Sequence, residues 1–238
     1  MVPEHDMANA DVAAVLLDAG GVLMLPSHER IVEALAPLGL GVDPARLDRA
    51  HYAGIRGHDA HPPGPGEWRG YLEAYARTLE VPDASVEDAI RALFAAFSAS
   101  ELLWRRPIES SVAALRELAR RGVRLGVVSN AEGTVEVRLR ELAICQVGPG
   151  PGVEVEVVID SHCVGVEKPD PAIFDFALRA MGLDPARCLY VGDSVRNDVL
   201  GSRAAGLVPV LMDPEGLHPA GDHARVRGLD ELLSLVLR

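Results

Sequence analysis

The sequence is poor in cysteine, has no long apolar run and carries no excess of positive charge. Its three cysteines, Cys145, Cys163 and Cys188, show no CxxC spacing, so we expect neither a disulfide framework nor a zinc site. No apolar run approaches the roughly 20 residues that cross a bilayer. The acidic N-terminus lacks the basic and then apolar pattern of a secretion signal. A cytoplasmic protein with reduced thiols and no membrane partner is therefore expected.

The formal net charge of −12 limits the partners that the chain is expected to bind. Nucleic acids and anionic membranes attract clustered positive charge, so neither is expected as a partner. A phosphorylated small molecule stays open as a ligand, because it needs only one or two local cations. The length of 238 residues suits one large domain, or a core with a smaller insert.

The stretch from Ala13 to Leu23 is an apolar run that stops at a carboxylate and two glycines. The run is too short for a helix and apolar at every position, which is typical of a strand buried on both faces. Asp18 ends it, and Gly20 and Gly21 permit a sharp turn and the close approach of a ligand. Open α/β sheets build their sites at such strand ends. The alternative is that Asp18 only begins a turn.

Residues 24–105 are expected to form an all-helical unit with no strand of its own. Apolar residues recur at helical spacing in four groups, which begin near Ile31, after Asp43, at Trp68 and after Ser85. The segment 58–66 is rich in proline and glycine, which predicts a loop.

From Pro107 onward, helices and strands alternate. This alternation predicts a parallel, doubly wound α/β sheet of the Rossmann-like type. Right-handed crossovers then bring the C-terminal ends of all strands to one edge. Strands are expected at 124–128, 155–159, 189–191 and 208–212, and helices from 110 or 111 to 122 and at 134–142, 171–181, 198–205 and 229–237.

Two polar signals in this half suit an anion. Ser129 and Asn130 follow the strand at 124–128, where a hydroxyl and neighbouring N–H groups favour anion binding. Lys168 precedes a helix and is able to meet a phosphate as a point charge. The alternatives are a serine that only caps the next helix and a solvated lysine.

Two carboxylates follow the strand at 189–191. Asp193 and Asp198 bracket a tight turn and, together with Asp18, offer oxygen ligands for a hard divalent cation. Mg²⁺ fits, since one or two carboxylates hold it while waters and substrate phosphate complete its shell. The alternative is helix capping by Ser194 or Asn197, which leaves Asp193 unexplained.

The stretches VLLDAGGVL, GVVSN, VGVEKPDP and YVGDSVRND, in this order and each at a strand end, resemble the motifs of the haloacid dehalogenase-like hydrolase superfamily. The resemblance covers nearly the whole chain and is most specific in GDSVRND. It implies the family's α/β core at 1–25 and 106–238 and its helical cap domain at 26–105. It also implies a Mg²⁺-dependent phosphatase that acts on a small phosphorylated metabolite. A monomer or a homodimer is expected.

The resemblance implies a role for each matching residue. Asp18 matches the nucleophile, which would form an aspartyl-phosphate. Ser129 and Lys168 match the further catalytic groups, which hold the transferring phosphoryl oxygens. The implied phosphate-binding residues are Ser129, Asn130 and Lys168. The implied metal ligands are Asp18, Gly20 through its main-chain carbonyl, Asp193 and Asp198, of which Asp198 supports the metal waters or Lys168.

One position departs from the family's pattern. Phosphatases of this family usually carry a second Asp two residues after the nucleophile, which protonates the leaving group and then activates water. This chain has Gly20 there, and such acid–base help is typically worth about 10²–10⁴-fold. We therefore expect slow turnover, a preference for a good leaving group such as an anomeric or acyl phosphate, or an acid borrowed from the cap. The cap candidates are His28, His58 and His61.

Two other functions stay open at this point. A 2-haloacid dehalogenase would use Asp18 as its nucleophile without metal, although dehalogenases usually carry Tyr at the position of Gly20. A non-catalytic phosphometabolite-binding protein is the second alternative. In the cap, the histidines are expected in solvated loops, and Trp68 and Tyr75 in the core. The candidates for substrate specificity are Arg56, His58, His61, Trp68, Arg69 and Tyr75.

Overall fold

The computed structural model describes residues 12–62, 64, 66, 68–99 and 103–236. Its contacts divide the chain into two compact units, one of Met1–Leu23 with Pro107–Arg238 and one of Met24–Arg106. The expected boundaries, after residue 25 and before residue 106, lie within two residues of these. That the second unit acts as a cap stays a prediction.

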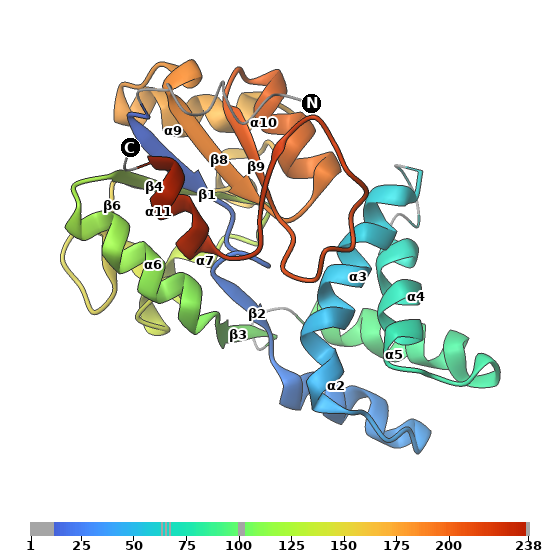
Figure 1. Ribbon diagram of the computed structural model, residues 1–238. Helices are drawn as coiled ribbons and strands as arrows, with labels where there is room; N and C mark the ends of the chain where they lie inside the picture. The colour runs from blue at the N-terminus through green and yellow to red at the C-terminus, as the bar shows by residue number, and fades with distance from the viewer. Residues whose placement is uncertain (1–11, 63, 65, 67, 100–102, 237–238) are drawn as a thin grey trace. The chain divides into compact units, whose positions relative to one another are not determined.

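The first unit is built on a six-stranded parallel sheet with the order β10-β9-β8-β1-β4-β7 (Figure 1). This confirms the predicted α/β fold class. The four residues of β1 are completely buried because β1 has neighbours on both edges and helices on both faces. The strands are β1 (Ala14–Leu17), β4 (Arg124–Ser129), β7 (Val157–Asp160), β8 (Cys188–Gly192), β9 (Val208–Met212) and β10 (Ala224–Val226).

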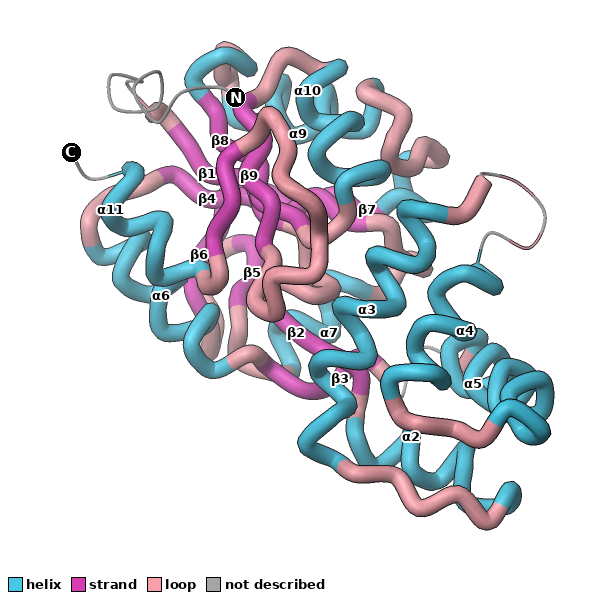
Figure 2. The backbone as a smooth tube through the Cα atoms, turned by 45° about the vertical axis from the view of Figure 1, so that its right-hand side comes forward, coloured by secondary structure: helices cyan, strands magenta, loops and turns pink. Residues whose placement is uncertain are grey.

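Helices cover both faces of this sheet (Figures 1 and 2). Helices α6 (Glu109–Arg120) and α11 (Leu232–Val236) lie against one face, and α9 (Ala172–Met181) and α10 (Gly201–Ala204) against the other. The apolar side of α9 packs on strand residues that include Leu16 and Val128. The shorter helices α7 (Val135–Glu141) and α8 (Ser161–Val164) follow β4 and β7.

In its described residues the second unit contains four α-helices, as predicted, and also a short two-stranded sheet. The expectation of an all-helical unit is therefore wrong in one respect. Strands β2 (Met24–Pro26) and β3 (Trp104–Pro107) pair where the chain enters and leaves the unit. Such short strands carry too few residues for a periodic pattern to reveal them. The helices are α2 (His28–Leu35), α3 (Leu47–Ala60), α4 (Trp68–Thr78) and α5 (Val86–Ser98).

The core of the second unit is mainly aliphatic and includes the buried rings of Tyr71 and Tyr75. Tyr75 is 1% exposed, as expected for a core residue, whereas Trp68 is 47% exposed, contrary to the prediction. His58 was expected in a solvated loop but lies in α3, which extends to residue 60, and is buried against Trp68. A second buried histidine, His51, hydrogen-bonds through Nδ1 with the Tyr71 hydroxyl at 2.9 Å.

Several elements of the first unit differ from the prediction. The expected strand 155–159 is divided between β6 (Val153–Val155), which pairs with β5 (Cys145–Val147), and β7. The helix expected from 198 begins earlier, with a π-helical turn over Val195–Leu200 that Ser194 caps. Strand β10 was not predicted. Strands of three residues depend on pairing with distant segments, which local sequence does not report.

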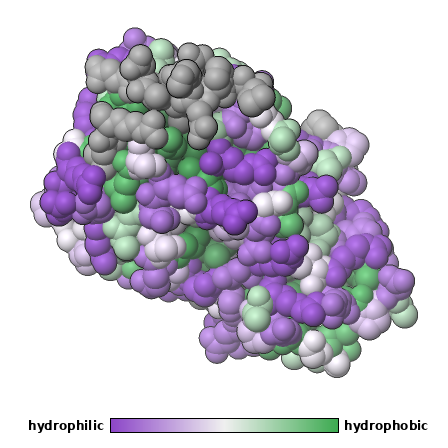
Figure 3. All heavy atoms as spheres, in the orientation of Figure 1, coloured by the Kyte–Doolittle hydropathy of each residue, from purple (hydrophilic) through white to green (hydrophobic). Residues whose placement is uncertain are grey.

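Hydrophilic side chains predominate on the face seen in Figure 3, and hydrophobic ones appear there in small separate groups. All three cysteines are free thiols. Within the described residues, no helix combines the length and the apolar character that a membrane crossing requires.

Candidate active site

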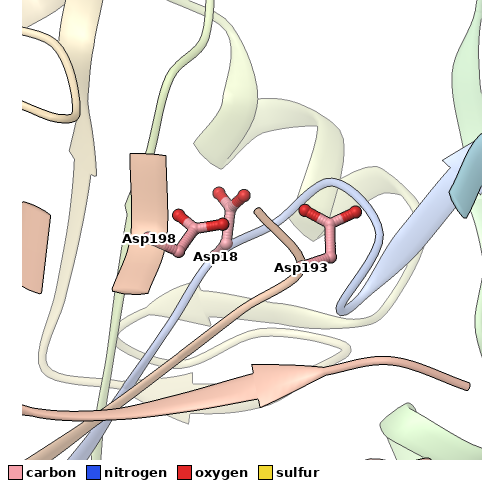
Figure 4. Close-up of side chains that lie close together, drawn as sticks. All are labelled: Asp18, Asp193 and Asp198. Carbon is pink, nitrogen blue, oxygen red and sulfur yellow. The ribbon is translucent and has the colours of Figure 1, made fainter. Parts of the chain in front are cut away.

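Three carboxylates from separate segments meet at the C-terminal edge of the sheet. Asp18 follows β1, Asp193 follows β8, and Asp198 lies in the π-helical turn beyond it. One oxygen of each lies within 4.8 Å of the others. Figure 4 shows Asp18 and Asp193 pointing the same way, with the carboxyl group of Asp198 beside that of Asp18. The sequence predicted this cluster from the positions of strand ends.

Asp18 is held in place by main-chain and side-chain contacts. Its N–H donates to the carbonyl of Val191 at 2.8 Å, which continues the pairing of β1 with β8 past the end of β1. Its Oδ1 accepts from the N–H of Ala19 at 2.8 Å and lies 3.1 Å from the Lys168 ammonium. The side chain of Asp18 is 12% exposed, so it is oriented by the protein and still reachable from solvent.

Lys168 is the only lysine in the chain, which has 22 arginines. Its side chain is almost completely buried, and Nζ lies 2.7 Å from Asp198 Oδ1 and 3.1 Å from Asp18 Oδ1. Burial by itself lowers the pKa of Lys168, but the two carboxylates outweigh it and raise that pKa. The ammonium therefore stays charged and partly neutralises the carboxylate cluster. A solvated lysine, the alternative, is wrong.

Asp198 uses both of its oxygens within the protein. Its Oδ1 accepts from Lys168, and its Oδ2 accepts from the N–H of Ser194 at 2.9 Å. Burial raises the pKa of Asp198 above its usual value, and the nearby ammonium of Lys168 offsets this only in part. Gly192 leaves room for this side chain, because a Cβ there would lie 2.1 Å from Asp198 Cγ. Asp198 thus supports Lys168, and Asp18 and Asp193 are the better placed carboxylates for an ion.

Ser129 and Asn130 lie at the end of the neighbouring strand β4. Ser129 is buried as the last residue of β4, opposite Asp160 of β7. The side chain of Asn130 binds the main chain of Lys168 at both polar atoms, at 2.8 and 2.9 Å. The side chain of Asn130 therefore positions Lys168. The expected phosphate-binding role of Asn130 is left to its main-chain N–H and stays a prediction.

Two residues at this edge were missed by the sequence reasoning. The Tyr190 hydroxyl lies 2.9 Å from Lys168 Nζ and donates to the carbonyl of Val128 at 2.8 Å. A tyrosine inside an apolar buried strand was a usable signal, because its hydroxyl needs a partner there. Asp160 accepts hydrogen bonds from the N–H groups of Gly133 and Val135, which follow Ser129 in the chain.

The donor set fits a hard divalent cation. All of its side-chain ligands are carboxylate oxygens, which Mg²⁺ prefers over nitrogen or sulfur. Three carboxylates face one ammonium, so these four groups carry an excess of negative charge that a divalent cation would balance. The expected contribution of the Gly20 carbonyl stays a prediction.

The cap candidates for acid–base chemistry lie in the second unit. There His28 Nε2 lies 2.7 Å from Asp48 Oδ1, and Arg106 binds the same oxygen. Arg69 pairs with Glu87. These contacts pair the side chains with neighbours within the helical unit.

Comparison with known proteins adds the family context. A family model described as haloacid dehalogenase-like hydrolase matches residues 12–206. A glyceraldehyde 3-phosphate phosphatase of Methanothermobacter thermautotrophicus is 35% identical over 125 residues, which are 52% of this chain and 53% of that protein. A phosphoserine phosphatase of Thermus thermophilus is 38% identical over 110 residues, 46% and 41% of the two chains. The alignments thus span about half of these relatives or less.

Two solved structures share the fold. The HAD phosphatase of Thermococcus onnurineus has a TM-score of 0.56 and 21% identity over 94% of this chain and 98% of that chain. The HAD-hydrolase YfnB of Bacillus subtilis has a TM-score of 0.62 and 15% identity over the same shares, 94% and 98%. At this identity the likeness concerns the fold alone.

Proposed function

Because the chain belongs to the haloacid dehalogenase-like hydrolase family, we propose that it is a Mg²⁺-dependent phosphatase of a small phosphorylated metabolite. The observation that carries the proposal is the Asp18 carboxylate, held 3.1 Å from Lys168 at the sheet edge beside Asp193. Relatives named glyceraldehyde 3-phosphate phosphatase and phosphoserine phosphatase support the same reaction class.

In this proposal Asp18 attacks the phosphorus atom of the bound ester. A bond forms between its carboxylate oxygen and phosphorus while the bond to the leaving oxygen breaks, which yields an aspartyl-phosphate. Water then attacks the phosphorus, and inorganic phosphate leaves with Asp18 regenerated. An anion attacks an anion here, so Lys168 lowers the barrier by its charge beside the reacting oxygens. Ser129 at the end of β4 would bind a phosphoryl oxygen.

Asp18 and Asp193, with the carbonyl of Gly20, would hold the metal ion. When bound, Mg²⁺ would supply positive charge to the phosphoryl oxygens and orient the phosphate. Asp198 would act through Lys168, whose ammonium it contacts at 2.7 Å.

Gly20 sets the proposed substrate preference. The usual acid at this position would protonate the departing oxygen, and glycine has no group to do so. Substrates whose leaving group departs without protonation, such as anomeric sugar phosphates and acyl phosphates, would then be hydrolysed faster than ordinary alkyl phosphates. A histidine of the helical unit that supplies the proton would remove this preference.

The test is phosphate release from a panel of phosphorylated metabolites, with Mg²⁺ and with EDTA. We expect metal-dependent release that falls to background in Asp18→Asn. The matched control is Asp184→Asn, the same change at an exposed capping carboxylate of the same unit, which should retain activity. Full turnover in Asp18→Asn, or release that EDTA does not affect, would contradict the proposal. Metal-free halide release from 2-haloacids would favour a dehalogenase, and no reaction with either class would favour a binding protein.

A further inference from the structure

We propose that Tyr190 is the positioning residue of Lys168, whose ammonium its hydroxyl directs toward Asp18. The inference rests on the proposed function, in which the charge of Lys168 acts beside the reacting oxygens. It assigns a role to a side chain that lies outside the carboxylate cluster and does not reach the substrate.

Tyr190 occupies the middle of β8 and is completely buried. Its hydroxyl accepts from Lys168 Nζ at 2.9 Å and has two acceptors for its own proton, the carbonyl of Val128 at 2.8 Å and, at 3.2 Å, Asp198 Oδ1. Val128 immediately precedes Ser129 in β4, and β1 lies between β8 and β4. One hydroxyl thus connects the proposed phosphate-binding strand with the lysine that neutralises the nucleophile.

The hydrogen bonds of the ammonium account for its three protons. A lysine ammonium has three N–H donors and no acceptor. Lys168 Nζ has three acceptors nearby, namely Asp198 Oδ1 at 2.7 Å, the Tyr190 hydroxyl at 2.9 Å and Asp18 Oδ1 at 3.1 Å. Asp198 and Tyr190 occupy two of the donors, so the third is directed at Asp18. Without the hydroxyl, the ammonium would be free to rotate or tilt toward Asp198.

The use of lysine here fits this account. The chain uses arginine at all 22 of its other basic Lys/Arg positions. A guanidinium is a planar fork, whereas an ammonium is a compact charge whose donors point in three directions. The three acceptors around the buried Nζ of Lys168 come from three segments, an arrangement that suits an ammonium and not a planar guanidinium.

The variant Tyr190→Phe removes the hydroxyl and keeps the ring. The ring packs edge-on against Phe174 with centroids 4.8 Å apart, and that contact survives the change. We expect kcat to fall by about 10-fold or more, the effect of losing a hydrogen bond to a charged group. KM should stay within about twofold, because the lost orientation matters most when charge develops in the transition state.

A second readout does not depend on activity. Lysine labelled with nitrogen-15 at Nζ gives one side-chain ammonium resonance in this protein, because Lys168 is the only lysine. We expect Tyr190→Phe to shift or broaden this resonance at constant pH. Tyr71→Phe is the control, since it removes another buried, hydrogen-bonded hydroxyl from the helical unit and should leave the resonance unchanged.

Phe174→Leu separates positioning from core packing. It alters the same core beside Tyr190 and keeps the hydroxyl. If Tyr190 only filled space, both variants would lower the melting temperature and neither would change kcat or the resonance of the folded protein, which would overturn the inference. If Tyr190→Phe does not fold, the wild-type spectrum decides, because a nuclear Overhauser effect must link the ammonium to the Tyr190 ring. A wild-type protein that releases no phosphate contradicts the proposed function, while the resonance still tests the contact.

Discussion

The side chain of Asn130 forms two hydrogen bonds with the main chain of Lys168, 38 residues further along the chain. Its Oδ1 accepts from the Lys168 N–H at 2.8 Å, and its Nδ2 donates to the Lys168 carbonyl at 2.9 Å. Asn130 follows Ser129 directly in the chain. Its hydrogen bonds therefore connect Ser129 with Lys168, the two residues proposed to hold the phosphoryl oxygens. This contact fixes the main chain of Lys168, while Tyr190 and Asp198 fix its ammonium.

The variant Asn130→Asp tests whether these two hydrogen bonds position Lys168. The change keeps the acceptor for the Lys168 N–H but sets a carboxylate against the Lys168 carbonyl. We expect a loss of about 1–3 kcal/mol in the free energy of unfolding, together with a lower kcat because Lys168 is displaced. Urea unfolding and phosphate release measure the two effects. The control is Gln146→Glu, an amide-to-acid change at a buried side chain that binds Gly148 and Gly152 elsewhere in this unit, and it should lower stability alone.

Asp160 is expected to control the affinity for the phosphate group. Its carboxylate accepts hydrogen bonds from the N–H groups of Gly133, Val135 and His162, and so holds the segment that follows Ser129. In Asp160→Asn one acceptor oxygen becomes a donor, so at least one of these N–H groups loses its partner. We expect KM to rise severalfold with a smaller change in kcat. An unchanged KM in a stably folded variant would show that this segment does not position the phosphate site.

The sequence was most informative where chemistry coincides with the end of a strand. Asp18, Ser129 and Asp193 each end an apolar run, and parallel topology was sufficient to bring them to one edge. The partners of Asn130 and Tyr190 were beyond its reach. Their hydrogen bonds join residues 38 and 62 positions apart, and neither periodicity nor composition carries that information. A polar side chain at a position expected to be buried is expected to have a hydrogen-bond partner, but only the fold identifies that partner.

Helices α3 and α4 approach so closely at Gly57 that a larger side chain there should destabilise the helical unit. A Cβ on Gly57 would lie 2.3 Å from the carbonyl oxygen of Gly70, which is main chain and unable to move aside. Gly57→Ala should therefore destabilise the helical unit by about 1–3 kcal/mol, although alanine favours helices by about 1 kcal/mol over glycine. Thermal unfolding followed by circular dichroism measures the effect. Gly41→Ala is the control, because open space surrounds its Cβ, and it should be neutral or slightly stabilising.

Two buried tyrosines should make the protein unstable in alkali. Burial raises the pKa of Tyr190 well above its usual value, and the negative charges of Asp198 and Asp18 raise it further. Burial also raises the pKa of Tyr75. In the folded state Tyr75 and Tyr190 therefore keep phenol protons that they release in the unfolded state at about pH 10. Their contribution to stability is fully present below that pH and is lost as the pH rises toward the raised values.

Tyrosinate absorbance and circular dichroism, recorded together against pH, test this expectation. Ionisation of Tyr75 and Tyr190 should coincide with the loss of helical signal, because each proton leaves only when the surrounding core opens. Tyr75→Phe and Tyr190→Phe should each reduce the late absorbance step by one of the chain's four tyrosines. If the absorbance of both residues rises while the helical signal is still intact, their hydroxyls are accessible in the folded state and this account of their burial is wrong.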